Sequence, residues 1–225
     1  MSHAFDPSRA AVLAVDLQND YLPEGNWPVA GYDQVLAKAA QVMAAARAAE
    51  VPVVHIQMWK DPARGMGPPS QEVVDRPEWL GGMAGSWGAE LSAPVAAAPG
   101  ETVLRKTFAS GFRDTELDRR LRDLGIGDVM VAGVWTDICV RGTVLDAVDL
   151  GYRVWLVKDA CGSGTRDMHE TAVVDMANRL YGGWISGAEE AVKALAGAPA
   201  EPWRFTRPVA FAFTRDDLSA HYAAL

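Results

Sequence analysis

Short apolar runs alternate with longer amphipathic segments along most of the chain. Runs rich in β-branched and aliphatic residues are typical of strands buried on both faces, whereas segments with apolar residues three and four apart are typical of helices. The predicted strands cover residues 11–15, 53–56, 102–105, 129–132, 154–157 and 184–185. The predicted helices cover residues 33–49, 114–124, 138–150, 166–180 and 188–195. This alternation predicts an open, doubly wound α/β fold with a mostly parallel sheet of about six strands and helices on both faces.

We expect one domain over residues 1–196, with two segments that depart from the alternation. Residues 60–100 are crowded with proline, glycine and tryptophan, which predicts a loop-rich insert. Its tryptophans fit either a substrate lid or filler for the core. Residues 197–225 form a C-terminal extension, rich first in alanine and proline and then in aromatic residues, that would pack on its own domain or on a partner subunit.

Charge and cysteine content narrow the class of protein. The 225 residues carry 21 lysines and arginines against 29 aspartates and glutamates, a net charge of −8. This acidic balance disfavours nucleic acid and membrane surfaces as partners. The two cysteines, Cys139 and Cys161, give no disulfide framework. From the residues at the N-terminus and the lengths of the apolar runs, we expect neither a signal peptide nor a membrane-spanning helix. We expect a cytoplasmic protein.

Three reactive side chains follow predicted strands. Asp16 ends the first strand, Lys106 ends the third, and Cys139 begins the helix after the fourth. Ligands bind at the carboxyl ends of strands in open α/β sheets, so these residues should share one edge. A helix N-terminus and an ammonium group favour the nucleophilic thiolate, and a carboxylate can accept the thiol proton. Each residue alone also has a structural interpretation: Asp16 as a cap, Lys106 as a solvated strand end and Cys139 as a packed thiol. The prediction of an active site therefore depends on all three lying at the same edge of the sheet.

Four motifs give the sequence a family resemblance. Residues 14–21 (AVDLQNDY), 104–112 (LRKTFASGF), 133–140 (GVWTDICV) and 157–161 (VKDAC) resemble the isochorismatase-like cysteine hydrolases, over residues 10–195. The resemblance implies that Asp16, Lys106 and Cys139 form a catalytic triad. It also implies a cis peptide bond before Trp135 and an oxyanion hole made by the backbone N–H groups of Trp135 and Cys139.

Departures from the family pattern indicate which branch of the family the sequence resembles. Nicotinamidase-like members carry an Asp/His metal cluster after the second strand, whereas here His55 is followed by no second histidine until His169. We therefore expect no metal and no other cofactor. Residues 86–91 and 182–186 are most similar to the branch that cleaves ureides, such as ureidoacrylate and biuret hydrolases.

The preferred hypothesis is a metal-independent hydrolase in which Cys139 attacks the carbonyl of a small amide or ureide. Tyr21, Phe108, Trp135 and Trp87 are the expected substrate-binding residues. One alternative is an ether or ester hydrolase that uses Asp16 and Lys106 while Cys139 is a bystander. Another is a non-catalytic assembly subunit, which would need no lowered thiol pKa. A Cys139 pKa of about 8.5 or above would favour this subunit over the enzyme. Related proteins commonly self-associate, which predicts a homodimer or homotetramer.

Overall fold

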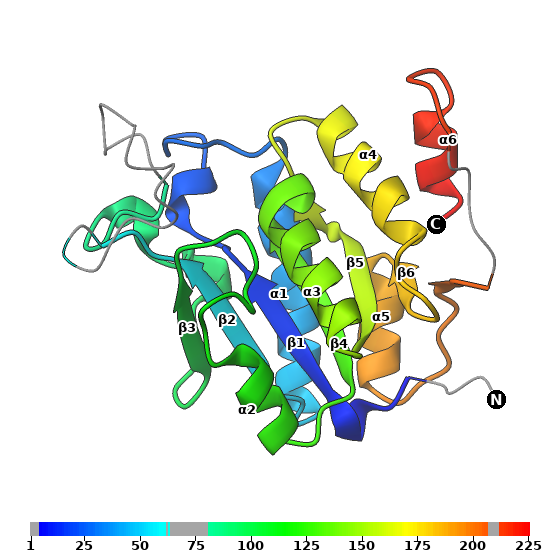
Figure 1. Ribbon diagram of the computed structural model, residues 1–225, viewed down its shortest axis with the longest axis horizontal. Helices are drawn as coiled ribbons and strands as arrows, with labels where there is room; N and C mark the ends of the chain where they lie inside the picture. Colours follow the sequence, from blue (N-terminus) through cyan, green and yellow to red (C-terminus); the bar gives the residue numbers. More distant parts are fainter. Residues whose placement is uncertain (1–4, 62, 64–80, 207–211) are drawn as a thin grey trace.

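The protein forms three layers, with one sheet between two sets of helices (Figure 1). The computed structural model describes residues 5–61, 63, 81–206 and 212–225. The strand order is β3-β2-β1-β4-β5-β6-β7, with β7 antiparallel to β6 and the other neighbours parallel. The strands are β1 (Ala10–Val15), β2 (Val53–Met58), β3 (Thr102–Lys106), β4 (Asp128–Val134), β5 (Arg153–Gly162), β6 (Trp184–Ser186) and β7 (Trp203–Arg204). The predicted doubly wound α/β fold is confirmed.

Helices cover both faces of the sheet and bury its central strands. Helices α1 and α5 lie on one face, and α2, α3 and α4 lie on the other (Figure 1). Every residue of β1 is buried, and its side chains alternate between the two cores, as Val12 and Leu13 illustrate. The helices are α1 (Tyr32–Ala48), α2 (Leu117–Asp123), α3 (Arg141–Asp149), α4 (Arg166–Ala177), α5 (Ala188–Leu195) and α6 (Leu218–Ala223).

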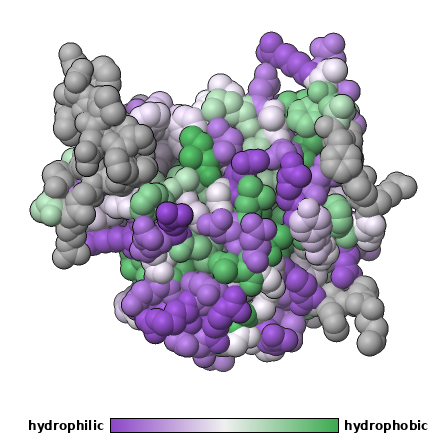
Figure 2. All heavy atoms as spheres, viewed as in Figure 1, coloured by the Kyte–Doolittle hydropathy of each residue, from purple (hydrophilic) through white to green (hydrophobic). Residues whose placement is uncertain are grey.

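The outer surface of α2 is strongly hydrophilic. Figure 2 shows polar side chains gathered over this helix at the bottom of the view. The salt bridges Arg119–Asp123, Arg120–Glu116 and Arg122–Asp118 join side chains four residues apart. Its inward side chains Leu117 and Leu121 are fully buried. This division of polar and apolar residues is the pattern from which the helix was predicted.

The C-terminal extension packs on its own domain. Its strand β7 pairs with β6, so the sheet has seven strands rather than about six. Trp203–Arg204 follows Pro202 and contains a charged residue, so it forms no apolar run, which is why the sequence did not predict β7. Helix α6 lies against α4, where the Tyr222 hydroxyl is 3.1 Å from Nε2 of His169. The carbonyl oxygen of Tyr222 accepts a 2.9 Å hydrogen bond from Lys158 Nζ.

The described part of the loop-rich insert is tied to the end of the sheet. It contains two short helical turns, η5 (Trp87–Ala89) and η6 (Ala93–Val95). The Ala89 carbonyl accepts hydrogen bonds from the side-chain amides of Gln18, at 2.7 Å, and Gln57, at 2.6 Å. Residues 62 and 64–80, with Trp79, lie outside the described residues. The choice between a substrate lid and core filler for this segment stays a prediction.

No helix in the described ranges combines the length and apolar character needed to cross a membrane.

The contact of α6 with α4 predicts a pH-dependent stability. His169 lies between Thr136 and Tyr222, and burial lowers the pKa of His169 to about 4. In the unfolded chain the pKa of this histidine is near 6.5. As the pH falls from 6.5 toward about 4, the unfolded chain therefore takes up a proton that the folded protein does not, and the folded state loses stability. Over this interval we expect the wild-type free energy of unfolding to fall by about 2 kcal/mol more than that of His169→Gln.

Urea unfolding at a series of pH values measures this difference. His221→Gln, which changes a partly buried histidine on α6, is the matched control and should follow the wild type. Equal pH slopes for wild type and His169→Gln would contradict the prediction.

Candidate active site

The loop after β1 places Asp16 at the carboxyl edge of the sheet. The backbone of Asp16 has a φ of 50°, in the left-handed region that non-glycine residues rarely adopt. Its backbone N–H donates a 2.7 Å hydrogen bond to the carbonyl of Ile56 on the neighbouring strand. The side chain is fully buried. A strained residue held this firmly is typical of a functional position.

Lys106, at the end of β3, forms an ion pair with Asp16. Its Nζ lies 2.7 Å from Oδ2 of Asp16 and donates a second hydrogen bond, of 3.1 Å, to the Phe108 carbonyl. Strand β2 lies between β1 and β3, so the lysine side chain must cross the end of β2 to reach the carboxylate. Both side chains have no exposed surface. The two residues are therefore brought together although 90 positions separate them in the sequence.

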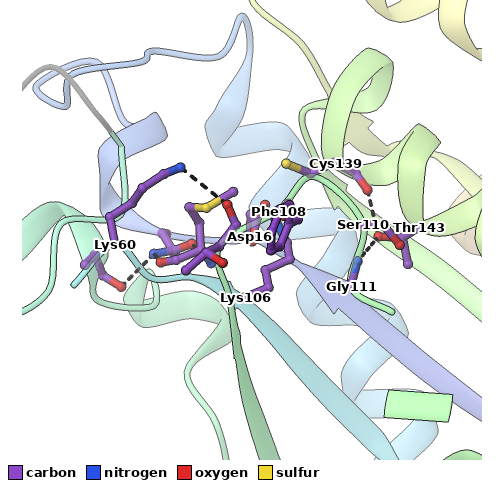
Figure 3. Close-up of polar contacts among 12 residues, drawn as sticks. Asp16, Lys60, Lys106, Phe108, Ser110, Gly111, Cys139 and Thr143 are labelled. Atoms are coloured by element: carbon purple, nitrogen blue, oxygen red, sulfur yellow. Dashed lines mark hydrogen bonds and ion pairs between the residues drawn. The ribbon is translucent and has the colours of Figure 1, made fainter. Parts of the chain in front are cut away.

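Cys139 lies in a π-helical turn, η7 (Thr136–Val140), which leads directly into α3. Its carbonyl oxygen accepts a 2.7 Å hydrogen bond from the Thr143 hydroxyl. The same hydroxyl accepts a 2.9 Å bond from the backbone N–H of Gly111 (Figure 3). The turn that carries Cys139 is thus tied to the loop after β3, where Phe108 also lies.

Asp16, Lys106 and Cys139 influence one another electrostatically. Burial raises the pKa of Asp16, and the adjacent Lys106 opposes that effect. Burial opposes the charged form of Lys106, but the ion pair with Asp16 prevails and raises the pKa of Lys106. Oδ1 of Asp16 is buried and has no hydrogen-bond partner in the described part of the chain. This oxygen is available to accept a proton.

The thiol of Cys139 differs from the sequence-based expectation. We expected the helix N-terminus and Lys106 to favour the thiolate. In the structure, burial and then the neighbouring Asp16 carboxylate outweigh Lys106 and raise the pKa of Cys139 to about 12. The resting side chain is therefore a neutral thiol, and an attack by sulfur would need a base beside it.

A small pocket reaches Cys139. It has a volume of about 210 Å³, less than the roughly 300–1,000 Å³ of pockets for drug-sized ligands, and so suits a small molecule. Two larger hollows, of about 600 and 590 Å³, lie elsewhere and do not include Cys139. The described residues that line the small pocket are Tyr21, Trp27, Met58, Lys60, Gly81, Trp135, Ile138 and Cys139.

The expected substrate-binding residues divide into two groups. Tyr21 and Trp135 line the pocket. Phe108 does not belong to the described lining, and its ring lies 5.3 Å from the Arg113 guanidinium carbon. Trp87 also lies outside that lining and is 52% exposed. The peptide bond between Val134 and Trp135 is cis, as the resemblance implies.

Sequence reasoning missed several residues of the pocket. Met58 and Lys60 lie at and just after the end of β2, so the strand-end rule that selected Asp16 could also have selected them. Trp27 packs edge-on against Trp135, with ring centroids 6.2 Å apart. This contact joins loops that follow different strands, and no local sequence pattern predicts it.

His55 has a structural partner. It is fully buried on β2, and its Nε2 lies 2.9 Å from Oε2 of Glu101. Arg47 and His55, together with the Ala98 backbone N–H, lower the pKa of Glu101 to about 2 despite its partial burial. Within the described ranges, no three histidine, cysteine, aspartate or glutamate side chains gather to hold a metal ion. His55 thus contributes to an ion-paired network beside β3.

Comparisons with known proteins define the family. Residues 10–190 match the Isochorismatase domain, and the chain therefore belongs to the isochorismatase domain family. It is 31% identical over 217 residues to ureidoacrylate amidohydrolase RutB of Variovorax paradoxus, covering 88% of this chain and 85% of that relative.

Solved structures agree with this assignment. An isochorismatase family protein from Desulfovibrio vulgaris superposes with a TM-score of 0.73 at 33% identity, covering 84% of this chain and 98% of that one. N-carbamoylsarcosine amidase from Thermoplasma acidophilum gives a TM-score of 0.67 at 27% identity, covering 80% and 97%.

The raised thiol pKa predicts how Cys139 reacts with iodoacetamide. In a Cys161→Ala background, where Cys139 is the remaining cysteine, the alkylation rate should rise about tenfold per pH unit between about pH 7 and about pH 10. Only the thiolate reacts, and its fraction keeps rising until the pH reaches the pKa. Mass spectrometry of quenched samples measures the rate. A rate that levels off below about pH 8.5 would show a lowered pKa and contradict this prediction.

Proposed function

We propose that this protein is a metal-independent cysteine hydrolase that cleaves a C–N bond of a small amide or ureide through a covalent intermediate on Cys139. The observation that carries the proposal is that Cys139 lies in the wall of a small pocket and interacts electrostatically with the buried Asp16–Lys106 ion pair. The names of two relatives, a ureidoacrylate amidohydrolase and an N-carbamoylsarcosine amidase, support an amidohydrolase within this family.

The first chemical step transfers the thiol proton. Cys139 gives its proton to Oδ1 of Asp16, and the sulfur bonds to the substrate carbonyl carbon. Burial raises the pKa of Asp16 as well as that of Cys139, so the carboxylate is a stronger base than an exposed aspartate. Once Asp16 is neutral, the Lys106 ammonium balances the negative charge that passes to sulfur and then to the carbonyl oxygen.

The remaining steps release the two products. The backbone N–H groups of Trp135, which precedes η7, and of Cys139, within η7, stabilise the negative oxygen of the tetrahedral intermediate. The C–N bond breaks, and the leaving nitrogen takes the proton from Asp16 as ammonia or an amine. A water molecule, deprotonated by Asp16, then hydrolyses the thioester formed from an amide or the thiocarbamate formed from a ureide, and the proton returns to the Cys139 sulfur. Because this nucleophile must stay reduced, the reducing cytoplasm is its proposed location.

Two alternative functions give Cys139 a different role and predict different experimental results. An ether or ester hydrolase acting through Asp16 and Lys106 would keep its activity after alkylation of the thiol. A non-catalytic subunit would release ammonia from no compound. We expected a thiol pKa this high to favour the subunit. It does not separate the subunit from the enzyme, because a neutral thiol beside a basic carboxylate is compatible with both.

Removal of the sulfur nucleophile tests the proposal. The wild type should release ammonia from at least one member of a panel of ureides, carbamoyl compounds and primary amides that includes ureidoacrylate. Cys139→Ala should reduce kcat by at least about 10⁴-fold with the thermal unfolding midpoint retained, because covalent catalysis is lost and the fold is not. A coupled ammonia assay and a melting curve measure these effects.

The second cysteine provides the control. Cys161 is buried, with its sulfur 3.9 Å from the Val131 carbonyl, and Cys161→Ala should keep its activity. Iodoacetamide should inactivate the wild type and Cys161→Ala alike. Turnover by Cys139→Ala, or by the alkylated protein, would refute Cys139 as the nucleophile and favour the acid–base alternative.

We also propose that the protein is a homodimer or homotetramer, as the family resemblance suggests. The C-terminal extension no longer supports this, because it packs on its own sheet and helices. Multi-angle light scattering at micromolar concentration should give two or four times the chain mass. The mass of a single chain would contradict self-association.

A further inference from the structure

Two glycines lie where β5 leads into α4, at the carboxyl edge of the sheet. Gly162 ends β5, and Gly164 lies in the loop that follows. Neither glycine has a positive φ, so the backbone conformation does not require glycine at either position. At Gly164 the surrounding space requires it. An added Cβ atom would lie 2.8 Å from both Cη2 and Cζ3 of Trp135, well inside the roughly 3.5–4.0 Å at which carbon atoms pack.

The loop that carries Gly164 is fixed by the residue before it. Ser163 is buried, and its carbonyl accepts a 3.0 Å hydrogen bond from the backbone N–H of Ala30. Its hydroxyl donates a 2.6 Å hydrogen bond to Oδ1 of Asp137, in the turn η7 that also holds the nucleophile. A shift of the loop would break these contacts.

The end of β5 has no room to move either. A Cβ atom at Gly162 would lie 2.7 Å from Cγ1 of Val29 and 3.0 Å from Cγ2 of Val35, so the backbone packs closely against both side chains. By contrast, the atoms of Trp135 nearest Gly164 are at the far end of an indole that turns about two side-chain bonds. A methyl group at Gly164 should therefore displace the ring and not the loop.

The ring that would be displaced forms part of the wall of the candidate active site. Trp135 lines the pocket of about 210 Å³ together with Cys139. It packs edge-on against Trp27, another residue of this lining, with ring centroids 6.2 Å apart. Because Gly164 and Trp27 both restrict the indole, a methyl group at Gly164 should push part of the ring into the pocket. In a pocket this small, even a slight displacement changes which groups fit.

We propose that Gly164 determines substrate specificity by leaving the space in which the Trp135 indole rests, and thereby sets the largest group that can reach Cys139. The inference rests on the proposed function and narrows it to amides or ureides with a small, unbranched group next to the scissile carbonyl. Gly164 acts through Trp135 and does not touch the substrate. The turn at residues 162–164 thus takes part in substrate selection.

Alkylation of Cys139 by reagents of two sizes tests the inference without any hydrolysis. Iodoacetamide and N-ethyliodoacetamide have the same reacting carbon and differ in the bulk of the amide substituent. In a Cys161→Ala background, Gly164→Ala should raise the ratio of the small-reagent rate to the large-reagent rate by about tenfold, the scale of one excess carbon in an apolar pocket. Because both reagents meet the same thiolate fraction, the ratio is independent of the thiol pKa.

Trp135→Phe provides the reciprocal test. Phenylalanine is the smaller ring, so Trp135→Phe should lower the ratio below that of the wild type. In the double variant Gly164→Ala/Trp135→Phe, the ratio should lie within about twofold of Trp135→Phe alone, because the methyl group no longer meets the indole. Effects that simply add would show that Gly164 acts on the pocket by another route, and would overturn the inference.

A glycine at the opposite edge of the sheet provides the matched control. Gly127, just before β4, has no positive φ, and an added Cβ atom would lie 3.1 Å from Nη2 of Arg9, the far end of a flexible side chain. Gly127→Ala should keep the wild-type ratio. In folded Gly164→Ala, an unchanged ratio would overturn the inference, including one in which both rates fall equally through a disturbed Cys139.

Melting curves establish that each variant is folded. If Gly164→Ala does not fold, Trp135→Phe and the double variant carry the test. Equal ratios in the wild type and Trp135→Phe would then overturn the inference.

Turnover separates failure of the inference from failure of the proposed function. For compounds that the wild type hydrolyses, Gly164→Ala should lower kcat/KM more for the bulkier members, mainly through a higher KM. If the wild type hydrolyses no compound of the panel, this counts against the hydrolase proposal alone, because the alkylation ratios still decide the role of Gly164.

Discussion

The buried ion pair between Lys106 and Asp16 is the constraint around which this edge of the sheet is organised. Two charges without exposed surface are tolerated only when they compensate each other with good geometry, and the 2.7 Å contact meets that condition. The pair can form only if β1, β2 and β3 end in register, because Lys106 crosses the end of β2 to reach Asp16. The order of three strands is thus coupled to the electrostatics of one small pocket.

The pair also sets the chemical character of the neighbouring thiol. A cysteine in water near a lysine would be expected to ionise readily. Here burial dominates and keeps Cys139 protonated, with its pKa near 12. The same burial raises the proton affinity of Asp16. In this buried site the resting nucleophile is a neutral thiol with a basic carboxylate beside it. In the proposed mechanism the sulfur attacks the substrate as the thiol proton moves to Asp16.

Segments far apart in the chain complete the surroundings of this pair. The described part of the insert holds Lys60 through Gly82 and Ala84 and is itself anchored by the side-chain amide of Gln18, close to Asp16 in the loop after β1. On the other side, Thr136 at the start of η7 contacts His169, which in turn contacts Tyr222 of the C-terminal helix. The pocket is therefore bordered by the insert and supported by α4 and α6, and its shape depends on packing across the whole carboxyl edge.

The sequence by itself determined the order and type of the main elements, because hydrophobic periodicity is a local property of the chain. Helix α5 begins and ends at the predicted residues, and Asp16, Lys106 and Cys139 could be selected because each follows a strand. Only the tertiary structure decided the rest. Strand β7, the contact of Trp27 with Trp135 and the burial that controls the Cys139 thiol all depend on residues distant in sequence. The physical reason is that periodicity is encoded within a few residues, whereas desolvation and electrostatic coupling arise only when separate segments exclude water together.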